Sequence, residues 1–369
     1  MKKICMVTTS EIFHDTRILS EAAVLARSYD VTILAKKYPN QKVVKYPFEI
    51  KLVNYRKFTI FQLNILSSFF ALIKAAKKEK PDVFHGHDLD GLLCCFWAAI
   101  RWRKILVYDS HELWSETYPF KNLKGVQWLL PIMEKLMIWR VKIGLTVNES
   151  LAKYLEEKYH KHFIALYNIG INQKSAKSPY NFKALFPGKK MILHLGGADE
   201  GRGMEEMIKA AKILGPKYVL IFVGGGKTEE ELKNIAMASK VTNVHFFDAV
   251  NPDEINQTVV QADLALALTQ KISRSYYYSM PNKIFQYLQA KTPILGSNFP
   301  EFKKIILRNK IGEVVDPSSP QKIAVKIAQM TLKKSQQQYR RNLNFEIQKK
   351  YSWHLEGLKL TKLYEKIIS

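Results

Sequence analysis

The chain has 369 residues, more than one hydrophobic core usually supports, so we expect two domains. Hydrophobic residues make up 47% of it and charged residues 24%, a mixture that excludes an intrinsically disordered protein. The formal net charge of +24 points to an anionic partner. Nucleic acid is disfavoured, because no helix-turn-helix, RNA-recognition or zinc pattern occurs. An anionic membrane surface fits the charge better, and a lysine-rich surface without any partner is the alternative.

The first half of the chain alternates apolar runs with helical patterns. Strands are predicted over residues 3–9, 31–35, 82–86, 104–109, 143–147 and 163–167. Helices are predicted over residues 15–28, 60–79, 89–100 and 149–160, with a further long segment over 125–141. Strands that alternate with helices form parallel sheets covered on both faces.

The second half of the chain repeats this alternation. Strands are predicted over residues 190–196, 218–223, 243–247, 263–268 and 293–295. Helices are predicted over residues 203–214, 227–238, 252–260 and 281–290, and an amphipathic helix over 351–369. We therefore expect an α/β protein with two parallel sheets, whose ligands bind at the carboxyl ends of the strands.

Several features favour a soluble or peripheral protein in a reducing compartment. No apolar stretch reaches the roughly 18–20 residues that span a bilayer. Met1-Lys2-Lys3 leads directly into a strand and does not resemble a signal peptide. The three cysteines, Cys5, Cys94 and Cys95, lie in apolar elements, so packing is expected and not disulfide formation or metal ligation. We expect a cytoplasmic location, with peripheral attachment to the inner face of the cell membrane.

Two segments carry the prediction of membrane contact. Residues 31–80 hold 11 basic residues against two acidic ones. Residues 126–140 mix large apolar side chains with basic residues and two Trp, as helices in a bilayer interface do. The alternative for the second segment is a crossover helix that packs on the first sheet.

A first candidate anion site lies at residues 279–295. Pro281 suits the first turn of a helix, where its missing N–H costs nothing. Asn282 and Lys283 follow at the positive end of that helix. Free N–H groups and a Lys side chain at a helix start favour a diphosphate. An ordinary amphipathic helix that starts with proline is the alternative.

A second candidate anion site follows the apolar strand at residues 191–195. Gly196 and Gly197 let the backbone approach a ligand, and Arg202 can donate two hydrogen bonds to phosphate oxygens. The segment has neither the Gly-Lys-Ser/Thr of a P-loop nor the spacing of a dinucleotide-binding loop. Alone it is a weak signal, but the two sites together indicate a nucleotide diphosphate.

These two segments resemble the donor-binding half of the family 4 glycosyltransferases, retaining enzymes with the GT-B architecture. Further segments resemble the same family: His14 to Leu19, Tyr108 to Trp114, Tyr167 to Asn172 (an interdomain hinge), Ile221 to Gly226 and Val244 to Asp248. The resemblance implies two facing Rossmann-like domains with a donor cleft between them. It assigns residues 1–169 and the helix 351–369 to an N-terminal acceptor domain, and residues 170–350 to a C-terminal donor domain.

The resemblance also assigns functional residues. His111 is the expected catalytic residue, in contact with the donor sugar or its phosphate. The expected acceptor contacts are Asp15, Arg17 and His87. Donor contacts beyond those already named are Gly224, Gly225, Phe247 and Gln286. The alternative for each histidine is a hydrogen-bonded loop residue, and the alternative for Asp15 is a helix cap.

No metal or other cofactor is expected. Arg202, Lys283 and the helix start can neutralise a leaving diphosphate without one. Asp88-Leu89-Asp90 has the pattern of metal-dependent transferases, but it stands at a helix start in the first domain, remote from both anion sites. Capping of that helix by Asp88 explains the pattern better.

Two departures from the family pattern bear on function. Tyr278 and Gln286 stand where many members carry Glu, and Gly197 stands where they often carry a basic residue. Gln286 can bind hydroxyl groups but cannot act as an acid or base. We expect metal-independent, retaining transfer from a nucleotide-diphosphate sugar to a glycan or lipid-linked acceptor, in surface polysaccharide or glycolipid synthesis. The alternatives are a catalytically weak homologue that serves as a binding or scaffold subunit, and a sugar-nucleotide epimerase.

Overall fold

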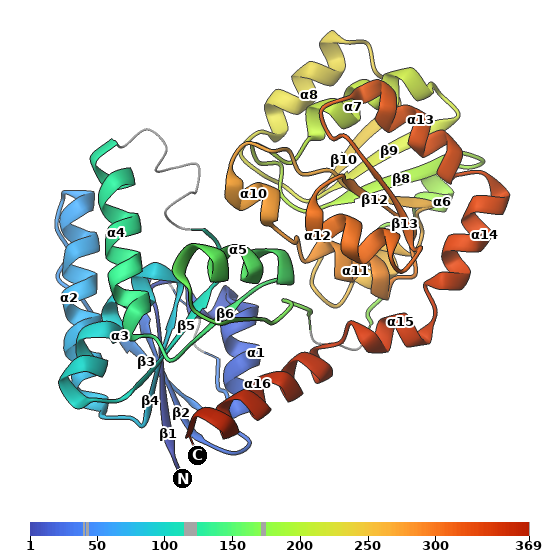
Figure 1. Cartoon of the computed structure of the whole chain (residues 1–369). Coiled ribbons are helices and arrows are strands. Elements are labelled where there is room, and N and C mark those ends of the chain that lie inside the picture. Colours follow the sequence, from blue (N-terminus) through green and yellow to red (C-terminus); the bar gives the residue numbers. More distant parts are fainter. Residues whose placement is uncertain (40, 42–43, 114–123, 171–174, 369) are drawn as a thin grey trace. The chain divides into compact units, whose positions relative to one another are not determined.

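The computed structural model describes residues 1–39, 41, 44–113, 124–170 and 175–368. The chain forms two compact units (Figure 1). The first unit combines Met1–Asn168 with Trp353–Ser369, and the second is Ile169–Ser352. Trp114 of the Tyr108 to Trp114 motif lies outside the described residues, as do Ile171 and Asn172 of the expected hinge.

The first unit contains a seven-stranded parallel sheet in the order β3-β2-β1-β4-β5-β6-β7. Its strands are β1 (Lys3–Thr8), β2 (Asp30–Lys36), β3 (Glu49–Val53), β4 (Val83–His87), β5 (Ile105–Ser110), β6 (Ile143–Thr146) and β7 (Phe163–Ala165). The sequence predicts six of these strands and misses β3. This edge strand pairs with β2, and Glu49 and Lys51 interrupt its apolar residues. It therefore lacks the continuous apolar run of a strand buried on both faces.

Helices cover both faces of this sheet (Figure 1). One face carries α2 (Phe61–Glu79), α3 (Asp88–Trp102) and α4 (Lys124–Arg140), and α3 contacts both of the others. The other face carries α1 (Thr16–Leu25) and α16 (Trp353–Ile368), which contact each other. The 3-10 helix η1 (Ile12–His14) precedes α1, and α5 (Glu149–Tyr159) connects β6 to β7.

The predicted C-terminal helix returns to the first unit as α16. Leu360 and Tyr364 of this helix are buried in one apolar cluster with Ile18 of α1 and Ile33 of β2. The hydroxyl of Tyr364 lies 2.8 Å from Nδ1 of His85, which is 279 positions away in the sequence. Removing water from this apolar surface is what holds the last helix of the chain against the first sheet.

The second unit contains a six-stranded parallel sheet in the order β10-β9-β8-β11-β12-β13. Its strands are β8 (Lys190–Leu195), β9 (Tyr218–Val223), β10 (Val244–Phe247), β11 (Leu264–Ala267), β12 (Ile294–Ser297) and β13 (Gly312–Val315). The sequence misses β13, a four-residue edge strand with Gly312 and Glu313 at its start. Two parallel sheets covered by helices confirm the predicted α/β class.

Many short helices surround the second sheet. They are α6 (Phe182–Leu185), α7 (Met204–Leu214), α8 (Glu229–Ala238), α9 (Ile255–Val259), α10 (Arg274–Tyr278), α11 (Lys283–Gln289), α12 (Pro300–Phe302), the π-helix η4 (Lys303–Leu307), α13 (Pro320–Met330), α14 (Lys333–Asn342) and α15 (Phe345–Lys350). Apolar residues of α7, α8 and α13 pack in one cluster with β8, β9 and β11. This packing fixes the loop between β8 and α7, which carries the second predicted anion site.

Candidate functional site

Glycines shape the carboxyl ends of β8 and β9. Gly196 (φ 115°) and Gly224 (φ 133°) adopt positive φ values that side chains disfavour. A Cβ on Gly224 would lie 2.8 Å from the carbonyl oxygen of Gly196. The N–H of Ala198 donates to the carbonyl of Gly225 at 3.0 Å, and that of Gly224 donates to the carbonyl of Phe247 at 2.9 Å. The two strand ends therefore hold each other closely, with the bare backbone that a ligand can approach.

Lys283 reaches this glycine loop from α11. Its Nζ lies 3.0 Å from Nε2 of His194 and 3.2 Å from the position of a Cβ on Gly196. The sequence places Pro281 in the first turn of this helix, but α11 begins at Lys283, with Asn282 as its N-cap. Since the helix has only seven residues, the Lys283 side chain and not a long helix dipole supplies the positive charge.

Arg202 and Lys283 form a pair of cations without a counterion. Burial and the nearby Arg202 guanidinium lower the pKa of Lys283 to about 7. Arg202 lies over the ring of Tyr276, 5.7 Å from its centroid. Among the ion pairs of the described residues, none joins either cation to a carboxylate. Such an arrangement is suited to binding an anion.

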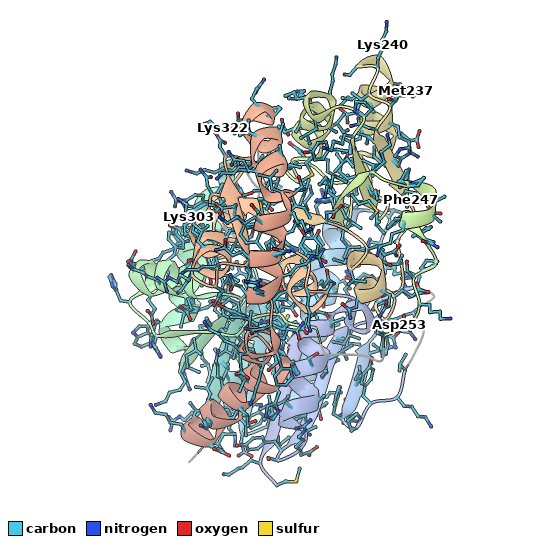
Figure 2. The ribbon with its side chains drawn as sticks, turned by 90° about the vertical axis from the view of Figure 1, so that its right-hand side faces the viewer. Met237, Lys240, Phe247, Asp253, Lys303 and Lys322 are labelled. Carbon is cyan, nitrogen blue, oxygen red and sulfur yellow. The ribbon has the colours of Figure 1, made fainter. Side chains whose placement is uncertain are left out.

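The other predicted donor residues lie around this loop with different roles. Gly197 and Gly225 belong to the paired strand ends. Gln286 lies one turn beyond Lys283 on α11 and is half-buried. Phe247 is labelled in Figure 2. Its ring packs against Phe182 of α6, with 5.0 Å between centroids, and its carbonyl accepts from the Gly224 N–H at 2.9 Å. The backbone of Phe247 therefore contacts the glycine segment at the end of β9.

A buried charge network occupies the carboxyl ends of β4 and β5 in the first unit. Arg17 Nε and one terminal nitrogen donate to the two oxygens of Asp109 at 2.9 and 2.8 Å. Its other terminal nitrogen donates to the carbonyl of Leu166 at 2.7 Å. The Arg17 guanidinium and the His111 imidazole hold the pKa of Asp109 well below its usual range against the cost of burial.

His111 lies between two carboxylates of this network. Its Nε2 is 2.9 Å from Asp109 Oδ2, and its Nδ1 is 3.6 Å from Asp88 Oδ2. Burial opposes the charged imidazole, but these carboxylates outweigh it and raise the pKa of His111 to about 10. His111 is therefore an imidazolium at neutral pH, a cation and hydrogen-bond donor and not a general base.

The structure bears on four predictions in the first unit. Arg17 is 2% exposed and His87 1%, so neither can contact an acceptor, because both side chains lie inside the core. Asp15 caps α1 by accepting from the Ile18 N–H at 3.2 Å, the alternative given above. Asp88 does not cap α3 and instead accepts from the His111 N–H at 2.9 Å.

One group in the first unit has the composition of a metal site. Ligand atoms of Glu21, His85, His87 and Asp109 lie within 4.8 Å of one another, and both Glu21 oxygens and the two histidine Nε2 atoms lack hydrogen-bond partners. However, both Asp109 oxygens already accept from Arg17, whose cation would repel a metal ion. Burial and the Asp109 charge also raise the pKa of Glu21 to about 8, so this carboxyl is neutral at pH 7. These contacts do not favour a divalent cation.

The sequence analysis gives no individual role to His194, which begins the segment of the second anion site, or to Asp109, which lies in the Tyr108 to Trp114 motif. His194 stands in an otherwise apolar strand, Met191 to Leu195, and a lone polar residue in a buried strand is a signal that could have identified it. Asp109 is linked to Arg17 across 92 positions of sequence, and no local pattern predicts that pair.

Both halves of the chain match family models. Residues 16–169 match the model described as Glycosyltransferase Family 4, and residues 178–347 match Glycosyl transferases group 1. An uncharacterised glycosyltransferase of Methanocaldococcus jannaschii is 22% identical over 371 residues, which cover 93% of this chain and 91% of the relative.

A second curated relative acts on a lipid-linked glycan. It is the alpha-1,4-N-acetyl-D-galactosaminyltransferase of Campylobacter jejuni that acts on GalNAc-GalNAc-diNAcBac-PP-undecaprenol. It is 23% identical over 225 residues, and the match spans 58% of this chain and only 59% of the relative's length.

Among solved structures, Anabaena HepE in complex with UDP-glucose superposes with a TM-score of 0.78. The match covers 99% of this chain and 100% of that chain at 12% sequence identity. At this identity the similarity establishes a shared fold.

Proposed function

Since the chain belongs to glycosyltransferase family 4 and has the GT-B fold, we propose that its donor is a nucleotide-diphosphate sugar. The observation that carries this proposal is the pair Arg202 and Lys283 beside the glycines of β8 and β9. Two cations without a counterion match the charge of a diphosphate, and the bare backbone lets it approach. HepE, which shares the fold, was crystallised with UDP-glucose, a ligand of this chemical class.

The proposed reaction needs no metal ion for its leaving group. When the bond between sugar and diphosphate breaks, negative charge accumulates on the departing diphosphate, and Arg202 and the protonated Lys283 supply positive charge there. The family resemblance supports transfer with retention. Nε2 of the His111 imidazolium already donates to Asp109, and Nδ1 lies 3.6 Å from Asp88, so the proposed role of His111 is to donate a hydrogen bond from Nδ1 to the donor sugar or its phosphate.

We propose that the acceptor is a lipid-linked or other membrane-proximal glycan. Large apolar side chains are exposed on three neighbouring helices of the first unit. This apolar helix face consists of Leu63, Leu66 and Phe70 on α2, Trp97 and Ile100 on α3, and Leu129, Ile132, Leu136 and Trp139 on α4. Exposed basic residues accompany it on the same helices: Lys74, Lys77, Arg101 and Lys135. Apolar side chains with basic neighbours suit the interface of an anionic bilayer.

The sequence predicts either that residues 126–140 lie in a bilayer interface or that they form a crossover helix packed on the first sheet, and α4 has features of both. Met137 and Ile138 of α4 are buried, so one side of this helix packs inward as a crossover helix does. Its opposite side leaves Trp139 78% exposed. Within the described residues, no helix has the length and apolarity to cross a bilayer. Contact from one side of the bilayer is therefore the mode that we propose.

Thermal unfolding in the presence of nucleoside diphosphates and their sugars tests the donor proposal. A ligand at 100 times its dissociation constant adds roughly 2.7 kcal/mol to the free energy of unfolding, which shifts the midpoint measurably. Stabilisation by one nucleotide, lost in the Arg202→Ala variant, is the expected result. No stabilisation by UDP, GDP, ADP or their common sugars would contradict a nucleotide-sugar donor.

The two alternatives make different predictions for the same protein. A binding or scaffold subunit would bind the donor without transferring or hydrolysing its sugar. An epimerase would convert the donor without any acceptor. Product analysis with and without a lipid-linked glycan therefore separates all three functions.

A further inference from the structure

We infer that His194 is a positioning residue, which holds the Lys283 side chain over the glycine loop so that Lys283 presents its charge to a bound diphosphate. This inference deepens the proposed function and rests on it. No ligand contact is assigned to His194 itself, whose side chain is buried in β8.

The tautomer of His194 follows from its two neighbours. Nδ1 lies 3.2 Å from the carbonyl oxygen of Leu266, which can only accept, so Nδ1 carries the hydrogen. Nε2 therefore bears a lone pair and accepts from the Lys283 ammonium at 3.0 Å. The imidazole thus connects the backbone of β11 to the amine of Lys283.

The surroundings of His194 hold its ring in place. The Leu266 carbonyl also accepts from the hydroxyl of Tyr287 at 3.1 Å, and that hydroxyl accepts from the Leu195 N–H at 3.0 Å. The ring of Phe222 meets the imidazole edge to face, with 5.8 Å between centroids. Because the acceptor is fixed, the flexible Lys283 side chain loses less freedom when a ligand binds.

Glycine at position 196 is part of the same arrangement. A Cβ there would lie 3.2 Å from Lys283 Nζ, a tight contact, and the φ of 115° already disfavours a side chain. The amine therefore occupies the space that glycine leaves free. The hydrogen bond to His194 and the space left by Gly196 together fix the position of Lys283 Nζ.

The arrangement has a consequence for pH. The groups that face Lys283 are His194 on β8 and Arg202 in the loop before α7. Burial and the cations Lys283 and Arg202 keep the pKa of His194 well below its usual range, so the ring stays neutral. With the pKa of Lys283 at about 7, a diphosphate binds the protonated amine, and binding takes up a proton above that pH. Affinity should be highest below pH 7 and fall toward tenfold per pH unit above it.

A double-mutant cycle tests the positioning role. The probe is whichever of UDP, GDP or ADP stabilises the wild-type protein most, with affinity measured by calorimetry. His194→Phe keeps an aromatic ring but removes the acceptor, and we expect binding about tenfold weaker. His194→Gln, which keeps an acceptor, should recover part of the loss. In a Lys283→Ala background, His194→Phe should cause no further loss.

Several outcomes would overturn the inference. Equal affinity in wild type and His194→Phe would do so, as would the same loss in both backgrounds, which marks a merely structural role. If His194→Phe does not fold, His194→Gln decides in the same two backgrounds, because a loss that is present with Lys283 and absent in Lys283→Ala still marks positioning through Lys283. The wild-type pH profile separately tests whether the Lys283 amine titrates when the ligand binds. Affinity measured from pH 6.5 to 9 should fall more steeply in wild type than in Lys283→Ala, whose profile carries the titration of the nucleotide alone. Parallel profiles would contradict a titrating Lys283, and an equal loss for His194→Gln in both backgrounds would reject the inference. A wild-type protein that binds none of the three probes would instead reject the proposed function.

Discussion

The two units of this chain gather charge at the same place, the carboxyl ends of parallel strands, but they treat it in opposite ways. In the first unit, Arg17 and His111 are compensated by Asp109, and all three Arg17 nitrogens donate to protein acceptors. In the second unit, Arg202 and Lys283 lie close together with a neutral imidazole as the partner of Lys283. We expect the compensated network to stabilise the fold and the uncompensated pair to bind an anion.

The sharpest way to break this comparison is to remove charge from the compensated network. Arg17→Met leaves the buried Asp109 carboxylate without its main partner, so we expect the free energy of unfolding to fall by about 3–5 kcal/mol. Urea denaturation measures the change. Lys153→Ala, which breaks the exposed pair with Glu157 in the same unit, is the matched control and should change stability by less than about 0.5 kcal/mol. Similar values for the two variants would show that the network does not stabilise the fold.

Removing a cation from the uncompensated pair should weaken ligand binding and leave the free energy of unfolding nearly unchanged. Lys283→Ala or Arg202→Ala removes a charge-assisted contact, and each should weaken nucleoside diphosphate binding by about 1.5–3 kcal/mol. The fold should not be destabilised by losing an uncompensated cation. Calorimetry measures the affinity, and Lys209→Ala on the exposed side of α7 is the control. Unchanged affinity in both variants would remove the donor site from this loop.

His111 tests whether the compensated network also takes part in the reaction. His111→Ala should reduce turnover at least tenfold, about 1.4 kcal/mol, and reduce donor affinity much less. Such a split marks an interaction made mainly in the transition state. Steady-state kinetics with the exposed His162→Ala as control distinguishes this from a general effect. Full activity of the His111 variant would leave it a structural member of the network.

The predicted membrane binding depends on exposed residues of the apolar helix face and its basic neighbours, outside both charge clusters. We expect binding to vesicles that contain anionic lipid, weakened by salt, with each basic residue near the surface contributing roughly 1 kcal/mol. Trp139→Ser should weaken it by removing an apolar side chain from the interface. Met237→Ser is the control, since Met237 is 67% exposed on α8 of the second unit (Figure 2). Co-sedimentation with neutral vesicles to the same extent would contradict the electrostatic account.

The smallest expected effect is that of metal removal. Because Arg202 and Lys283 are proposed to neutralise the leaving diphosphate, transfer should survive EDTA with unchanged turnover. The assay compares EDTA-treated protein with protein supplied with Mg²⁺ or Mn²⁺. Steep dependence of turnover on either ion would contradict this prediction. It would make Asp88 and Asp90, or Glu21 with the two buried histidines, candidate metal ligands.

The sequence predicts what local signals encode. Long apolar strands such as β1 and β9 are found at nearly their observed positions, and the glycines before α7 mark the donor loop. The edge strands β3 and β13 are not predicted, because these partly exposed strands contain charged residues or glycine and lack a continuous apolar run. The buried ion pair of Arg17 with Asp109 is not predicted, for a different reason. Burial depends on a carboxylate 92 positions away, which no spacing rule connects to it.

The return of α16 to the first unit determines when that unit can be completed during synthesis. Residues 169–352 leave the ribosome as an uninterrupted unit, whereas the first sheet must wait for the last residues of the chain before Leu360 and Tyr364 can cover it. Until then the apolar cluster that includes Ile18 and Ile33 lacks the side chains that α16 contributes to it. The nascent protein therefore passes through a stage in which the unit made first is the one still unfinished, and a chain that stops at residue 352 would remain there.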